Sequence, residues 1–256
     1  MSQLAAMLKV ARVDLSYFFR TKWLILTLVT LNLSDMFVVG LIYTNMMSFN
    51  YFVFFVPGVI IAGMFAAALD VGRRVHLGLS EGVTQYYLSL PLSLNGLAFA
   101  HILSAGLGGL IFSSILLLVA LSFVHGLFSL STLIMIPFMF FISMGLGGIA
   151  AVINLFSGGG DRFWAFAEGV QMALLGMSTV FYPLTAVKSI MPAFAVTAIT
   201  FNPLSQIADA LRLAIASASL SPYALLSISV TSLLMLVIGF FCYRHVFSKV
   251  RLLGKV

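Results

Sequence analysis

The sequence predicts an all-α membrane protein with six transmembrane helices, an N-terminal amphipathic interfacial helix and two short external re-entrant helices between spans five and six. Three observations predict this fold class: the composition, the length of the apolar stretches and the positions of the basic residues. Of the 256 residues, 62% are hydrophobic and 8% are charged, whereas a soluble domain carries about a quarter charged residues. The mean hydropathy is +1.15. A soluble fold cannot bury that much apolar surface.

Six apolar stretches are long enough to cross a bilayer, which takes about 20 residues for ~30 Å of hydrocarbon. They run from Trp23 to Tyr43, Tyr51 to Leu69, Leu97 to Val124, Leu133 to Phe156, Phe166 to Val187, and Tyr223 to Tyr243. Residues 1–256 are therefore predicted to form a single transmembrane domain. Any energy-supplying domain is expected on another chain.

The basic residues predict the orientation of the spans, because lysine and arginine concentrate in cytoplasmic segments. Eleven of the thirteen precede span one or follow spans two, four and six, leaving Lys188 and Arg212 on the other side. Both termini of a multi-pass cell-membrane protein are thus predicted to be cytoplasmic. The net charge of +6 suits anionic lipid headgroups, and no continuous basic stripe indicates nucleic acid.

Residues 1–22 are predicted to form an amphipathic helix on the cytoplasmic surface. Apolar side chains recur there at helical spacing, while Lys9, Arg12 and Arg20 occupy the opposite face. The pattern is consistent with a topology anchor and with a surface for a partner.

Residues 188–220 are apolar enough for a seventh span, but they contain prolines and two charged residues, and that span would place the basic C-terminus outside. Two short external helices are predicted instead. Pro203 begins the second helix, with Asn202 as its N-cap.

No pattern typical of nucleotide, metal or nucleophilic chemistry occurs in the sequence. The glycine run Gly158 to Gly160 is followed by Asp161 and Arg162, where a phosphate-binding loop needs lysine and a hydroxyl. The Gly-Leu-Gly-Gly runs at Gly106 to Gly109 and Gly145 to Gly148 lie inside spans and predict close helix packing. The four histidines are isolated, so no metal site is predicted. Because none of these patterns occurs, no cofactor and no enzymatic activity are predicted for this chain.

Asp35 is the one charge deep inside a predicted span, about 18 Å along the helix from Trp23. A carboxylate at this depth is costly and is a candidate for the substrate path or for gating. A structural hydrogen bond is the alternative. Water, Asn32, Asn154 or Arg212 are its expected partners.

Two further stretches carry ordered motifs. The first has Arg73 and Arg74 after span two, then Glu81-Gly82-Val83-Thr84-Gln85, then Leu90-Pro91-Leu92-Ser93. The second has Phe181-Tyr182-Pro183, then Asn202-Pro203-Leu204, then Asp209 and Arg212, which can pair on one helix face. In this order the stretches resemble the ABC-type-2 permeases, the membrane subunits of bacterial and archaeal ATP-binding-cassette exporters.

The resemblance implies roles for both stretches. Cytoplasmic ATPase subunits, which bring ATP and magnesium, would dock on a coupling loop at residues 72–96 through Arg73, Arg74, Glu81, Gly82, Gln85 and Pro91. Gln85 departs from the acid that many family members have there. An external gate would comprise Pro183, Asn202, Pro203, Asp209 and Arg212. A second permease, either another copy of this chain or a related chain, would complete a pathway for export of a hydrophobic drug, lipid or lipid-linked glycan.

Two other functions remain open at this point. A self-contained ion- or proton-coupled carrier would use Asp35 and the short helices, although the spans show no convincing inverted repeat. A membrane-embedded enzyme would need polar groups clustered at one depth, and the sequence does not indicate such a cluster.

Overall fold

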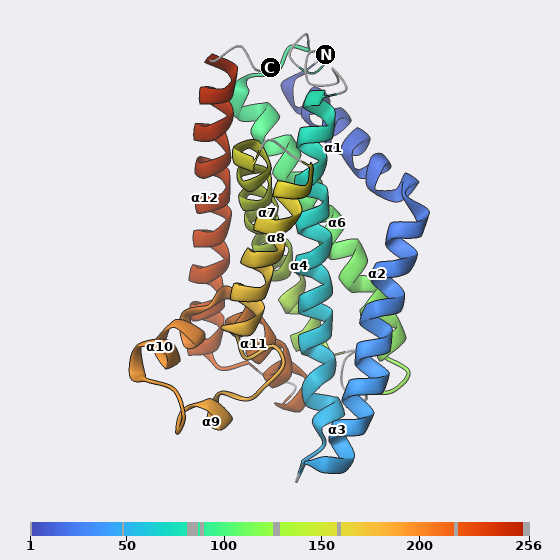
Figure 1. Ribbon diagram of the computed structural model, residues 1–256, viewed down its shortest axis with the longest axis vertical. Coiled ribbons are helices and arrows are strands. Elements are labelled where there is room, and N and C mark those ends of the chain that lie inside the picture. The colour runs from blue at the N-terminus through green and yellow to red at the C-terminus, as the bar shows by residue number, and fades with distance from the viewer. Residues whose placement is uncertain are drawn as a thin grey trace.

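The computed structural model describes residues 2–47, 49–80, 87, 90–124, 129–157, 160–217 and 220–252. Within them every regular element is a helix, which confirms the all-α prediction for this part of the chain. The long helices form one elongated bundle, and the first turn of α1 and the last turn of α12 lie at the same end (Figure 1). We call this the terminal end and the opposite one the distal end.

The helices follow each other in a simple order along the chain. They are α1 (Gln3–Arg20), α2 (Lys22–Ser34), the π-helix η1 (Asp35–Val39), α3 (Gly40–Met46), α4 (Tyr51–Ser80), α6 (Leu94–Ala120), α7 (Leu130–Ser157), α8 (Gly160–Gly176), α9 (Leu184–Val187), α10 (Ala193–Phe201), α11 (Pro203–Ser217) and α12 (Pro222–Leu252).

Five of the six predicted spans are present as helices long and apolar enough to cross a membrane. Among the described residues these are Ile25–Met46, Tyr51–Asp70, Leu94–Ala120, Leu130–Ser157 and Pro222–Lys249. The first combines α2, η1 and α3. The chain is therefore a helical multi-span membrane protein.

The predicted fifth span, Phe166 to Val187, is not one helix. α8 begins at Gly160 and ends at Gly176 after 17 residues, about 25 Å at 1.5 Å per residue. An irregular stretch then leads to Pro183, which precedes the short α9. The prediction overlooked that the backbone groups of this stretch bond to α11 and α4, which makes an early helix end favourable.

The segment after α8 gathers at the distal end as short helices (Figure 1). α10 and α11 match the two helices predicted between spans five and six. No helix in this part of the described chain qualifies as a seventh span. The N-terminal helix is present too, and Ala6, Val10, Ala11 and Phe18 are buried. α1 packs against α6, so part of its apolar face contacts protein.

α4 is the central helix of the bundle and packs against α6, α7 and α11. In its most apolar 18-residue window 83% of the residues are buried, against 11% for Ile25–Met46 and 17% for Pro222–Lys249. The first and last spans therefore present most of their apolar side chains to lipid or to another chain.

Glycines allow α7 and α12 to touch backbone to backbone, as the Gly-Leu-Gly-Gly run at 145–148 predicts. A Cβ added to Gly145 would lie 2.3 Å from the carbonyl oxygen of Met235, and one on Gly239 would lie 2.3 Å from that of Gly145. Real Cβ atoms do not approach backbone so closely, so any larger residue must push the two helices apart.

This packing predicts the effect of one added methyl group. We expect Gly145→Ala to destabilise the protein by about 1–3 kcal/mol, since α12 cannot yield without losing its other contacts. Thermal unfolding in detergent at a fixed scan rate measures this. Gly169→Ala on α8 is the control, because nothing lies within 4 Å of its added Cβ. Equal midpoints for the two variants would contradict the packing argument.

Candidate functional site

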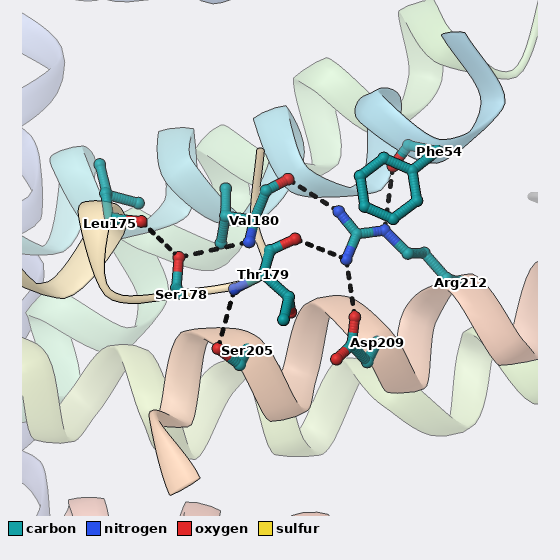
Figure 2. A network of polar contacts seen from close by, with 8 residues as sticks. All are labelled: Phe54, Leu175, Ser178, Thr179, Val180, Ser205, Asp209 and Arg212. Atoms are coloured by element: carbon teal, nitrogen blue, oxygen red, sulfur yellow. Dashed lines mark hydrogen bonds and ion pairs between the residues drawn. The ribbon is translucent and has the colours of Figure 1, made fainter. Parts of the chain in front are cut away.

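Residues 177–183, which we call the anchor loop, lie between α4 and α11 at the distal end (Figure 2). Arg212 reaches from α11 to both. Its Nη1 donates to the carbonyl of Thr179 at 2.8 Å, and its Nη2 donates to that of Val180 at 2.7 Å. Its Nε donates to the carbonyl of Phe54 on α4 at 3.0 Å. One guanidinium thus joins three segments that are distant in sequence.

The charge of Arg212 is balanced within the same cluster. Nη1 also donates to Oδ1 of Asp209 at 2.7 Å, which confirms the predicted pair. The guanidinium carbon lies 3.7 Å from the centre of the Phe54 ring, a cation–π contact. Burial lowers the pKa of Arg212 and Asp209 acts to raise it, but an arginine keeps its proton in proteins.

Other polar side chains fasten the anchor loop and the end of α8. Asn202 caps α11 as predicted, since its Oδ1 accepts from the Leu204 amide at 2.9 Å. Its Nδ2 donates to the carbonyls of Leu174 and Met177 at 2.7 and 2.6 Å. The hydroxyl of Ser205 accepts from the Thr179 amide at 2.9 Å. The backbone groups freed where α8 ends are therefore bonded by α11.

α4 lies directly against the anchor loop at Gly58. A Cβ there would lie 1.9 Å from the carbonyl oxygen of Val180. Pro57 precedes it inside the helix and has no amide proton to donate to the preceding turn. Both residues adapt α4 to the loop at the level where Arg212 binds Phe54.

Replacing Arg212 with lysine tests whether the several donors of the planar guanidinium are needed or only its positive charge. We expect Arg212→Lys to destabilise the protein by about 2–4 kcal/mol, because one ammonium cannot reach all three carbonyls and buried carbonyls without donors are costly. Thermal unfolding measures the change, with the exposed Lys188 replaced by arginine as control. A lysine variant as stable as the wild type would show that charge alone suffices.

Beside the anchor loop lies a cavity of about 530 Å³, which we call the distal pocket. Its lining comes from η1, α3, the segment between α3 and α4, the first turns of α4, the anchor loop and α9. The lining residues are Asp35, Val39, Tyr43, Met47, Phe49, Tyr51, Phe55, Phe181, Tyr182, Pro183 and Ala186. The fold thus brings together Asp35 and Pro183, two candidate residues 148 positions apart in the sequence.

Asp35 begins the π-helix that interrupts the first span. Single-turn π-helices often occur at functional sites. Asp35 is exposed, and within the described residues no side chain donates to its carboxylate. Its expected partners are engaged elsewhere: Asn32 donates to the carbonyl of Leu28 at 2.8 Å, and Arg212 pairs with Asp209. Asn154 is buried on α7 and does not line the pocket.

At the terminal end, a buried polar cluster was not predicted. The carboxylate of Asp14 on α1 lies 2.7 Å from Nδ1 of His101 on α6 and accepts from the Tyr87 hydroxyl at 3.1 Å. The Ser104 hydroxyl lies 3.4 Å from it. The ring of Tyr243 on α12 packs edge-on to His101 at 6.0 Å. Asp14 is the sole acid among residues 1–22, which was the signal available in the sequence.

The Asp14 cluster predicts a measurable coupling between α1 and the segment before α6. We expect Asp14→Asn and Tyr87→Phe each to destabilise the protein by about 0.5–2 kcal/mol, and the double variant by less than their sum. Thermal unfolding of the four proteins gives the coupling. Ser16→Ala on the exposed face of α1 is the control. Strict additivity would mean that the two side chains act independently.

The predicted docking residues are only partly within the described structure. Arg73 and Arg74 fall in the last third of α4, whose C-terminal end points to the terminal end of the bundle (Figure 1). Pro91 is exposed just before α6. Glu81, Gly82 and Gln85 lie outside the described residues.

No group of three histidine, cysteine, aspartate or glutamate side chains suited to a metal occurs in the described part of the chain.

The comparisons with known proteins do not assign this chain to a family. No protein-family model matches it, and a search of curated proteins found no matching relative.

Proposed function

We propose that this chain is the membrane-spanning permease subunit of an ATP-binding-cassette exporter. The observation that carries the proposal is the cluster at the distal end, where Asn202, Asp209 and Arg212 bond around the anchor loop that contains Pro183. Pro203 begins the helix that carries Asp209 and Arg212. The other motif stretch begins with Arg73 and Arg74 in the last third of α4, and Glu81, Gly82 and Gln85 lie outside the described residues.

In this proposal the chain performs no covalent chemistry. ATPase subunits dock at the terminal end on residues 72–96 and on α1, and ATP with magnesium binds in those subunits. Two permease chains enclose the path between them. The largely exposed first and last spans supply apolar surface for the second copy and for lipid.

α4 supports a mechanical connection between docking and gating. It runs without interruption from Tyr51 to Ser80, about 45 Å. Arg73 and Arg74 lie toward one end, and Phe54, bound by Arg212, lies at the other. A displacement of the docking segment therefore moves the anchor loop and the wall of the distal pocket together. Nucleotide drives such a switch when it binds the two states with different affinity.

The Asp14 cluster gives the docking segment a second connection to the bundle. Tyr87 lies in the predicted coupling loop and bonds to α1 through Asp14, which also contacts His101 on α6. α1, α6 and the loop residue are thus expected to move as one unit when an ATPase subunit closes.

A self-contained secondary carrier is the second candidate, favoured by one observation. Asp35 lines a pocket at a break in the first span and has no protein partner among the described residues, as an ion- or proton-coupling carboxylate would. Transport that needs ATP and survives collapse of the ion gradient supports the exporter. Transport that follows the gradient without ATP supports the carrier.

The docking assignment predicts which segment an ATPase subunit needs. We replace residues 81–85 with a Gly-Ser linker of equal length and purify the chain from its native membranes. Co-purification of a chain with a GxxxxGK[ST] motif, and its ATPase activity, should fall at least about tenfold while the permease stays monodisperse. The same linker at residues 125–128, between α6 and α7, should change neither. Full retention in the first variant would overturn the docking assignment.

A further inference from the structure

We propose that the distal pocket binds a hydrophobic organic cation, with the carboxylate of Asp35 as counter-charge and aromatic rings as walls. That this ligand is the exported substrate rests on the proposed function. That the pocket binds it rests only on the residues described above.

The size of the pocket suits an organic molecule. Its volume of about 530 Å³ lies within the range of roughly 300–1,000 Å³ typical of small-molecule sites. The lining is mainly apolar, with few polar groups, as in such sites. The pocket lies between the first span and the anchor loop, so a ligand would contact two segments that Arg212 and α4 hold in place.

The charge of the pocket favours a cation. Asp35 is the only charged side chain among the described residues that line it. A carboxylate in a membrane span without a partner is costly, and the charge is best balanced by a bound cation. Arg212 does not meet this need, because it does not line the pocket and four of its five N–H donors are taken by three carbonyls and by Asp209.

Aromatic rings supply six of the eleven lining residues. Tyr51 is at the centre of this group: its ring lies 5.5 Å from Tyr43, 6.1 Å from Phe49 and 5.3 Å from Phe55. The faces of aromatic rings attract cations electrostatically. The walls and the carboxylate therefore select the same sign of charge.

Two tyrosine hydroxyls reinforce this preference. Tyr51 donates its proton to the carbonyl of Phe181 at 2.5 Å, and Tyr182 donates its proton to that of Gly176. With their protons engaged, both oxygens can only accept from a ligand. An anion would meet no free donor from these two groups.

The oxygen ligands of the pocket do not fit a divalent metal ion. Calcium needs six to eight oxygen ligands and magnesium six, whereas this pocket offers a single carboxylate. A large ion with delocalised charge loses little hydration on entering an aromatic cavity and is the better match.

Two probe ions of equal shape and opposite charge test the proposal. We measure equilibrium binding of radiolabelled tetraphenylphosphonium to the purified full-length chain in nanodiscs, without nucleotide, and compete it with tetraphenylborate. We expect saturable binding of the cation and at least about tenfold weaker binding of the anion, because one charge contact of this kind is worth an order of magnitude.

Variants assign the binding to Asp35. Asp35→Asn should weaken binding of the cation about tenfold, and Asp35→Glu should restore most of it. Tyr43→Leu should weaken it about two- to fivefold through the lost ring. Glu168→Gln, which removes an exposed carboxylate on α8 outside the pocket, should leave it unchanged. Equal affinity for both ions, or an unchanged affinity in folded Asp35→Asn, overturns the proposal.

The failure of this proposal is distinguishable from failure of the proposed function. Charge-selective binding that needs Asp35, in a protein with no ATP-dependent transport, would support the pocket and reject the exporter. ATP-driven export that is indifferent to Asp35→Asn, without selective binding, would reject the pocket and leave the exporter standing.

Discussion

The structure of the distal end depends on the guanidinium of Arg212. A loop that interrupts a membrane bundle leaves backbone carbonyls without donors, and apolar surroundings make such groups costly. Arg212 supplies donors to Thr179 and Val180 on the loop and to Phe54 on α4, while Asp209 balances its charge. A planar group with several fixed donors can do this, whereas an ammonium cannot. Arg212, together with Asn202 and Ser205, therefore supplies hydrogen bonds that this irregular backbone needs.

This anchor also determines the shape of the pocket. The anchor loop is held against Gly58 and does not continue α8 as a helix. Phe181 and Pro183 from the loop therefore line the same pocket as Asp35 from the first span. The π-helix that begins at Asp35 lies on the opposite wall. Both walls thus depart from regular α-helix at the same level of the bundle. Such departures are tolerated in membranes where the backbone is covered by protein or borders a cavity.

At each end of the bundle, one charged side chain joins segments that are distant in sequence. At the distal end the guanidinium of Arg212 donates to backbone carbonyls, and at the terminal end the carboxylate of Asp14 accepts from His101 and Tyr87. Each cluster joins segments far apart in sequence, and α4 spans the distance between the levels at which they lie. Elsewhere in the bundle α7 and α12 pack backbone to backbone through small residues such as Gly145 and Gly239.

Much of the architecture was determined by local sequence. Apolar length and composition predicted six spans, of which five are present as long apolar helices among the described residues, because a bilayer demands about 20 apolar residues wherever they occur. Local rules also predicted α10 and α11, the Asn202 cap and the Asp209–Arg212 pair, since each depends on residues a few positions apart. Only the tertiary structure decided where α8 ends, that Asp14 has partners on other segments and that Asp35 shares a pocket with Pro183. Hydrophobicity is a sum over neighbours along the chain, whereas Asp14, Arg212 and Tyr51 each bond to segments distant in sequence that only packing brings together.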